Sequence, residues 1–175
     1  MILRELERGE LEAVWGIDRS EHVEGLYRHD KGELVLTGMP FEDEGWDPEE
    51  IGVYGPLLED CFDRGGFFLG AFDGAALAGV VVLDPRPVGG DRDLLQLFFL
   101  HVSRAHRRGG LGRTLLEAAA RRARGLGASR LYVSSSPSRN AVEFYLHLGC
   151  RLAPAPDPQL FAPEPEDIHL QYEIG

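Results

Sequence analysis

The sequence predicts a mixed α+β fold: a central, mostly antiparallel sheet with one parallel strand–helix–strand unit and helices on both faces. Two observations support this prediction. An apolar stretch over 94–102, a helical stripe over 110–126 and an apolar stretch from 131 follow one another, and such crossovers are right-handed with parallel strands in nearly all cases. Apolar stretches joined by short turns flank this unit, as in antiparallel hairpins. The length of 175 residues suits one domain, so we expect residues 1–175 to form a single domain.

The first elements are predicted from the spacing of apolar residues. Residues 2–6 are expected to form a strand, and residues 8–17 carry apolar side chains at helical spacing. Apolar positions alternate over 23–36 around Asp30-Lys31-Gly32, which predicts a hairpin.

A helix and a second hairpin are expected next. Asp47-Pro48-Glu49-Glu50 supplies an N-cap, a first-turn proline and acids near the positive end of the helix dipole, and this helix ends near 64–66. The apolar runs 67–72 and 76–83 are joined by Asp73-Gly74, which is a strong hairpin signal.

The rest of the chain completes the sheet. Residues 85–90 contain two prolines and two glycines and are expected to form a loop before the parallel unit. After that unit's second strand, over 131–134, a short helix is expected at 138–148. Alternation over 168–174 predicts a final strand.

The charge distribution argues against nucleic acid as a partner. The formal net charge is −11, whereas nucleic-acid binding needs a basic footprint. Residues 101–140 nevertheless carry a net charge of +8, which suggests either a local anionic ligand or a solvated helix face. The nine arginines of this segment are Arg104, Arg107, Arg108, Arg113, Arg121, Arg122, Arg124, Arg130 and Arg139.

Cysteine content and hydropathy indicate a cytoplasmic protein. Cys61 and Cys150 are the only cysteines, and one distant pair is neither a disulfide framework nor a set of metal ligands. The chain turns acidic at Glu5 and Glu7 before any apolar segment develops, and no apolar run approaches the ~18 residues that a membrane span needs. We therefore expect reduced thiols, no metal and no membrane association.

The segment from His106 to Arg113 is the strongest candidate site. It reads His-Arg-Arg-Gly-Gly-Leu-Gly-Arg and lies between the first parallel strand and its helix, where free N–H groups and the helix dipole can bind phosphate oxygens. Gly109, Gly110 and Gly112 would let the backbone approach a pyrophosphate and adopt positive φ. The nearby arginines would add charge-assisted hydrogen bonds.

Two common phosphate-binding motifs do not fit this segment. A P-loop needs a lysine after its second glycine, but Lys31 is the only lysine in the chain. A dinucleotide-binding fingerprint needs a glycine where Leu115 stands and an acid about 20 residues on, where Tyr132 and Val133 stand. The P-loop is therefore excluded, and the dinucleotide fingerprint is weak.

The turn Arg107-Arg108-Gly109-Gly110-Leu111-Gly112 fits the pattern Arg/Gln-x-x-Gly-x-Gly/Ala, and through it the chain resembles the GNAT superfamily of acyl-CoA N-acyltransferases. Residues 100–103 look like the end of the family's fourth strand, and 140–149 look like its Asn…Phe-Tyr…Leu-Gly segment. The resemblance covers about residues 67–150. Two positions depart from the family pattern, because Arg104 stands where proline is frequent and Cys150 where an aromatic is usual.

The resemblance implies an acetyl-CoA-dependent N-acetyltransferase whose co-substrate lies between two splayed parallel strands. The Val102 region would polarise the thioester carbonyl through a backbone N–H. Asn140 matches the family's cofactor-contacting asparagine and Tyr145 the tyrosine that protonates the departing thiolate, although a cap and a core aromatic are the simpler interpretations. The residues expected to bind the co-substrate are Leu100, His101, Val102, Arg107, Arg108, Gly109, Gly110, Leu111, Gly112, Arg113 and Asn140.

The expected mechanism is direct attack of an amine on the thioester in a ternary complex. A thioester already has a good leaving group, so the enzyme mainly holds the amine close and unprotonated. Tyr145 is the expected acid. His101 is the only titratable side chain on the strand that often carries the base in this family, and Asp18, Glu21 and His22 are alternatives.

The acceptor is expected to be a small-molecule amine or a peptide amine. Residues 1–60 hold 17 acids against five basic residues, so an acidic pocket for a cationic amine is one interpretation and a solvated acidic surface is the other. The acids considered for the entrance of such a pocket are Glu42, Asp43, Glu44 and Asp47. The alternative function is a non-catalytic acyl-CoA-binding domain of the same fold, and a homodimer stays open.

Overall fold

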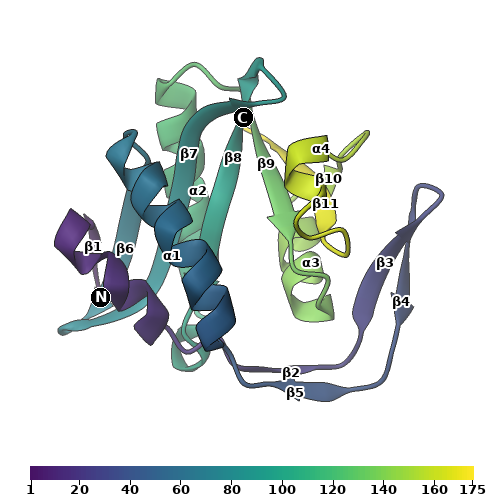
Figure 1. The fold of residues 1–175 in the computed structure, drawn as a ribbon, viewed down its shortest axis with the longest axis horizontal. Coiled ribbons are helices and arrows are strands. Elements are labelled where there is room, and N and C mark those ends of the chain that lie inside the picture. The colour runs from purple at the N-terminus through teal and green to yellow at the C-terminus, as the bar shows by residue number, and fades with distance from the viewer.

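A computed structural model describes residues 1–175 and places a seven-stranded sheet at the centre of the molecule (Figure 1). The strand order is β1-β6-β7-β8-β9-β11-β10, and only β8 and β9 run parallel. The expected mixed, mostly antiparallel sheet is therefore confirmed. The strands are β1 (Ile2–Glu5), β6 (Phe67–Asp73), β7 (Ala76–Val88), β8 (Asp91–Val102), β9 (Arg130–Ser135), β10 (Arg151–Leu152) and β11 (Ile168–Glu173).

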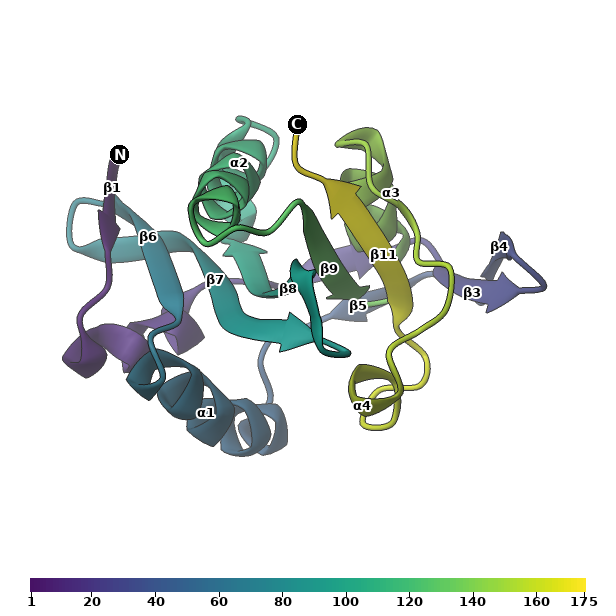
Figure 2. The ribbon, with the colours of Figure 1, turned by 90° about the horizontal axis from the view of Figure 1, so that it is seen from above.

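Helices cover both faces of the sheet, as the sequence predicts (Figure 2). On one face lie α2 (Leu111–Gly125) and α3 (Arg139–His147). On the other lie α1 (Pro48–Asp63) and the short α4 (Pro158–Phe161), together with η1 (Arg8–Gly16), which is a 3₁₀ helix.

The sheet separates two hydrophobic clusters. Leu115 and Ala119 of α2 pack with Leu95 and Leu97 of β8 in the larger cluster. The second cluster lies under η1 and α1, and its fully buried members include Val14, Leu58 and Val82. Because both faces are buried, the middle strands carry nearly continuous apolar runs.

A β-bulge in β8 changes which residues face each cluster. Val82 of β7 pairs with Phe99 and Leu83 pairs with Leu97, so Phe98 is an extra residue. Leu100 therefore lies on the same face as Leu97, in contact with the α2 cluster, and Phe99 lies on the α1 face.

The parallel strands β8 and β9 separate along their length. Their pairing begins at Leu94 with Arg130 and ends at Gln96 with Tyr132, although β8 continues to Val102 and β9 to Ser135. Figure 1 shows the two strands diverging beyond this point. This is the splay expected for the co-substrate site.

The prediction of a loop over residues 85–90 is wrong. Strand β7 continues to Val88, and the chain turns only at Gly89 and Gly90, whose φ values are 59° and 79°. The β7–β8 register shifts between Leu83 and Pro87, and prolines are tolerated at such irregularities because no ladder N–H is required there.

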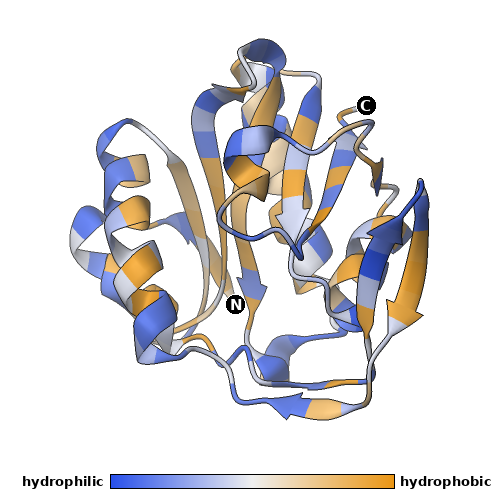
Figure 3. Ribbon diagram, turned by 45° about the vertical axis from the view of Figure 1, so that its right-hand side comes forward, coloured by the Kyte–Doolittle hydropathy of each residue, from blue (hydrophilic) through white to orange (hydrophobic).

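Four short strands form two small sheets beside the main one. The expected hairpin is confirmed as β3 (Leu26–Asp30) and β4 (Glu33–Thr37), with left-handed φ values at the turn residues Lys31 and Gly32. Strand β4 is hydrophobic along most of its length (Figure 3). The pair β2 (Glu21–Val23) and β5 (Phe41–Asp43), like β10 and α4, was not predicted from the sequence.

No helix is both long enough and apolar enough to cross a membrane.

Candidate active site

The backbone of the glycine-rich turn leaves donors free at the start of α2. Gly110 is the N-cap, has a left-handed φ of 85° and provides no side-chain cap. The N–H groups of Leu111 and the next two residues therefore have no intrahelical acceptor. A Cβ built on Gly110 would meet no atom within 4 Å, so the space beside the turn is open. This geometry fits a phosphate group.

Gly112 has a different role from the one expected. A Cβ at Gly112 would lie 2.9 Å from two ring carbons of Phe144, so its small size is required by the close approach of α2 and α3. Its backbone is not among those with positive φ. The glycine at this position is explained by packing between the two helices that border the splay.

Arg107 supports the turn with its side chain. Its Nε donates to the carbonyl of Val102 at 2.9 Å, and its Nη1 and Nη2 donate to the carbonyls of Ser20 and Asp18 at 3.1 and 3.3 Å. All three nitrogens are thus occupied within the protein. The expected phosphate contact is better suited to Arg108 and Arg113, which form no ion pair within the protein.

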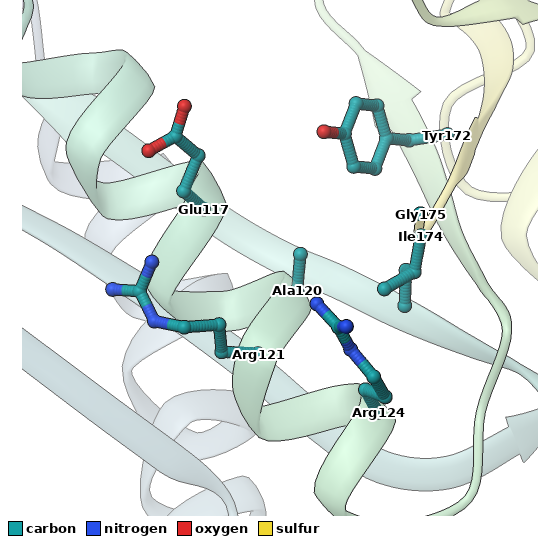
Figure 4. A pocket seen from close by; sticks show the side chains of 7 residues that line it. All are labelled: Glu117, Ala120, Arg121, Arg124, Tyr172, Ile174 and Gly175. Atoms are coloured by element: carbon teal, nitrogen blue, oxygen red, sulfur yellow. The ribbon is translucent and has the colours of Figure 1, made fainter.

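The other arginines of the basic segment do not converge on the turn. Arg121 and Arg124 line a hollow of about 200 Å³ with Tyr172 and the C-terminal Gly175 (Figure 4). This hollow lies along the later turns of α2, away from its N-terminus. The positive charge of residues 101–140 is thus spread over several surfaces.

The last residues of β8 offer backbone groups to the splay. The backbone N–H of Ser103, directly after β8, donates to the carbonyl of Ala78 near the start of β7 at 2.8 Å. Because successive residues of a strand point their N–H groups to opposite sides, Val102 and Leu100 direct theirs away from β7. Their N–H groups therefore face the side where pairing with β9 has ended, as expected for residues beside a pantetheine arm.

Tyr145 is buried within the α2 cluster. Burial raises the pKa of its hydroxyl, and the neighbouring Cys150 and Asp167 add to the rise. The hydroxyl has no hydrogen-bond partner in the protein and is not among the fully enclosed polar atoms. Tyr145 is therefore protonated at neutral pH and free to donate to a ligand.

Asn140 is engaged by the N-terminal part of the chain. Its Nδ2 donates to Glu21 Oε2 at 2.9 Å and to the carbonyl of His22 at 3.0 Å. These bonds join the start of α3 to β2. The predicted contact with the co-substrate would have to use the remaining amide oxygen or replace one of these bonds.

His101 lies on the α1 face of the sheet, opposite the face of Leu100 and Val102. Its ring is 4.8 Å from that of Trp46 and 5.0 Å from that of Phe99, between ring centroids. Burial lowers its pKa to about 3, and the positive charge of Arg19 contributes to the shift. The imidazole is neutral at pH 7 but is a weak base.

The acids considered for an acceptor entrance have local structural roles. Glu42 lies 2.5 Å from the Nδ1 of His22, and Asp43 accepts a bond from the N–H of Gly45. Asp47 caps α1 by accepting the N–H of Glu50 at 2.8 Å. These contacts favour the interpretation of a solvated acidic surface.

A carboxyl pair beside the splay was missed in the sequence. Ser134 at the end of β9 donates its hydroxyl to Asp167 at 2.8 Å, and Tyr54 of α1 donates its hydroxyl to Glu164. Burial and the adjacent Glu164 raise the pKa of Asp167 toward neutrality. No short motif marks these residues, because their partners come from two distant parts of the chain.

The chain was then compared with known proteins. The family model described as "Acetyltransferase (GNAT) family" matches residues 21–150. No curated protein matches the chain in sequence.

Several solved structures share the fold over nearly the whole chain. Nourseothricin acetyltransferase is 23% identical, with a TM-score of 0.73 and coverage of 99% of this chain and 98% of the other. Aminoglycoside 6'-acetyltransferase type Ii is 18% identical, with a TM-score of 0.67 and coverage of 100% and 98%. A Bacillus anthracis structure described as a streptothricin acetyltransferase is 15% identical, with a TM-score of 0.68 and coverage of 97% and 96%, and contains acetyl coenzyme A.

The site geometry and the comparisons agree. The open turn before α2 and the splayed parallel strands lie within the matched residues 21–150, which are most of the chain. The structural neighbours named above are acetyltransferases, and one of them binds acetyl coenzyme A. This chain therefore belongs to the GNAT acetyltransferase family.

Proposed function

We propose that the protein is an N-acetyltransferase that transfers the acetyl group of acetyl-CoA to a primary amine by direct attack in a ternary complex. The observation that carries this proposal is the splay between β8 and β9, which opens beside the free N–H groups at the start of α2. The backbone from Arg108 to Arg113 would hold the pyrophosphate, and Leu100 and Val102 would bind the pantetheine arm through their N–H groups.

Two groups of this chain are suited to the chemical step. The N–H of Val102 would polarise the thioester carbonyl. Tyr145 would donate its proton to the departing thiolate, for which its unpartnered hydroxyl and raised pKa are well suited. Neither cysteine serves as a nucleophile in this scheme, because burial raises the pKa of both Cys61 and Cys150 to about 12.

The proposed acceptor is a small cationic amine. Two structural neighbours are named as a nourseothricin acetyltransferase and an aminoglycoside 6'-acetyltransferase. These names guide the choice of acceptors to test. Polyamines and peptide amino groups belong in the same panel because the fold alone does not define the acceptor.

Calorimetric titration with acetyl-CoA, CoA, ATP and NAD tests the binding part of the proposal. We expect micromolar binding of acetyl-CoA and CoA and no binding of ATP or NAD. Thiol release from acetyl-CoA is then followed with nourseothricin, kanamycin, spermidine and a lysine peptide. Binding without release for any amine would favour the non-catalytic acyl-CoA-binding function, and absence of acetyl-CoA binding would exclude both functions.

A further inference from the structure

The carboxyl pair Glu164 and Asp167 has no part in the co-substrate site described above. Both residues lie in the connection between α4 and β11, and Asp167 directly precedes the first residue of β11. The backbone N–H of Asp167 donates to the carbonyl of Glu164 at 3.1 Å, and burial with the adjacent Glu164 raises the pKa of Asp167. Ser134 and Tyr54 donate their hydroxyls to the pair, one to each acid. The pair is therefore held from two sides.

This pair lies at the open end of the parallel strands. Strand β11 is antiparallel to β9, with Ile168 opposite Ser135, so the start of β11 lies beside the end of β9. Pairing between β9 and β8 has already ended at Tyr132. Asp167 is also near enough to Tyr145 for its charge to affect that hydroxyl. The pair thus adjoins the stretch in which β8 and β9 no longer pair.

The bond from Tyr54 connects the pair to the aromatic surface over β8. The Tyr54 ring lies 5.5 Å from that of Phe99, between ring centroids, and Phe99 lies beside His101 and Trp46. Tyr54 comes from α1 and Glu164 from the far side of β8 and β9 in the sheet order. The contact therefore crosses the α1 face of the splay, which is the side left for an acceptor.

We propose that Asp167, paired with Glu164, accepts the proton of the acceptor ammonium group and is a catalytic residue of the transfer. This inference rests on the function proposed above. The negative charge of the two carboxyl groups would attract an ammonium ion and fix it beside the thioester.

Asp167 suits this role better than His101. A general base works best with a pKa near the operating pH. Burial lowers the pKa of His101 to about 3, whereas burial and the adjacent Glu164 raise the pKa of Asp167 toward neutrality. Ser134 from β9 donates to Asp167 and Tyr54 from α1 donates to Glu164, and neither side chain is positively charged.

A second buried polar group on this face has a free donor. Tyr132 Oη accepts the N–H of Asp157 at 2.7 Å and so directs its own hydrogen to His169 Nδ1 at 2.6 Å. The Nε2 of His169 then carries the ring hydrogen, and it is buried without a partner in a residue that is 6% exposed. His169 is the second residue of β11 and pairs with Ser134, the residue that donates its hydroxyl to Asp167. Tyr132 thus links the segment at Asp157 to β11 through His169.

The proposed step balances in protons and bonds. The ammonium group transfers one proton to Asp167, and the neutral nitrogen forms a bond to the thioester carbonyl carbon. The carbon–sulfur bond breaks, its electron pair stays on sulfur, and Tyr145 protonates the thiolate. The nitrogen then loses a second proton, which restores Tyr145, and Asp167 releases the first proton to solvent. The products are an amide, a thiol and one proton.

The test compares pH profiles of kcat/KM for the wild type, D167N and the control E166Q, with thiol release from acetyl-CoA and the acceptor panel named above. Glu166 is exposed and adjacent to Asp167 in the chain. We expect D167N to lose roughly 10²-fold or more at pH 7 with unchanged acetyl-CoA binding. This loss should shrink as pH rises and the free amine becomes abundant without a base. E166Q should match the wild type.

The outcomes separate this inference from the proposed function. Wild-type protein without turnover for any amine overturns the proposed function. Wild-type turnover that D167N matches at pH 7, or a D167N loss that stays constant up to pH 10, overturns the role of Asp167 alone.

E164Q provides an independent test that keeps Asp167 in place. Without the negative charge of Glu164, the pKa of Asp167 should fall, so the acid limb of the profile should move to lower pH. An acid limb at the wild-type position in a folded E164Q protein contradicts the proposal, even if D167N does not fold.

Discussion

The ring of Phe144 lies so close to Gly112 that a Cβ there would be 2.9 Å from two of its carbons. This contact fixes the distance between the N-terminus of α2 and α3, which border the splay on the same face of the sheet. A local packing contact thus sets the position of the N–H groups proposed to bind the co-substrate.

We expect G112A to destabilise the protein and weaken acetyl-CoA binding together. Overpacking of this kind costs about 1–3 kcal/mol, because either the Phe144 ring must shift or α2 must move away from α3. Denaturant unfolding and calorimetry measure the two effects. G109A is the matched control, because its Cβ would meet only the carbonyl of His106 at 4.0 Å. Equal stability of the two variants would contradict this interpretation.

Loss of the hydroxyl should lower the rate of acetyl transfer at Tyr145 and the stability of the fold at Tyr132. The Tyr145 hydroxyl has no protein partner, so Y145F should fold with wild-type stability but transfer acetyl groups more slowly, by roughly 10²-fold. Y132F leaves the N–H of Asp157 and the Nδ1 of His169 without a partner, which should cost about 1–3 kcal/mol. Unfolding curves and thiol-release rates together check this. An unstable Y145F protein would contradict the free hydroxyl.

We expect Arg107 to stabilise the fold, and Arg108 and Arg113 to contribute to acetyl-CoA binding. R107K should lower the free energy of unfolding by about 1–2 kcal/mol, because an ammonium group cannot reproduce three directed bonds to Val102, Ser20 and Asp18. R108A and R113A should weaken acetyl-CoA binding with little change in stability. Calorimetry and unfolding measure these effects, and a stable R107K protein with weak binding would reverse the assignment.

Asp84 should make stability depend on pH. Burial alone would raise the pKa of this carboxyl, but the bonds from Arg64 and Arg86 outweigh burial and lower it. Because the folded pKa is lowered, the ionised group stabilises the fold above the unfolded pKa of about 3.9, and this stabilisation is lost as pH falls through the folded pKa.

D84N should therefore cost roughly 2 kcal/mol at pH 7, and the difference from wild type should narrow in acid. The exposed Asp60, which also pairs with Arg64, is the matched control, and D60N should cost less than about 1 kcal/mol. Unfolding at several pH values measures both. A difference that is constant with pH would exclude Asp84 as the titrating group.

The parts of the fold that depend on local signals could be predicted from the sequence. The capping box at Asp47 and Glu50 and the turn at Gly110 depend on residues within one or two turns. The crossover from β8 through α2 to β9 follows from its apolar periodicity. From these local features the fold class and the glycine-rich turn before α2 could be predicted.

The acceptor side could not be predicted because it depends on contacts between distant segments. Tyr54 and Glu164 are 110 residues apart and meet only after α1 and the end of the chain have packed on the same face. Arg107 looked like a phosphate ligand because its carbonyl partners at Asp18 and Ser20 carry no side-chain signal. The extension of β7 past Pro85 was missed because proline has no N–H to donate to a neighbouring strand. The register shift between Leu83 and Pro87 removes the need for that donor.

The extra residue at Phe98 puts the two halves of β8 out of phase with each other. Upstream of Phe98 the odd-numbered Leu95 and Leu97 contact α2, and downstream the even-numbered Leu100 and Val102 do so. With Phe98 kept but the bulge flattened into regular pairing, uniform alternation would turn His101 toward the core beneath α2 and Leu100 away from it. One bulged residue thus keeps the apolar side chains of both halves of β8 against the α2 core and His101 among the aromatic rings of the α1 face.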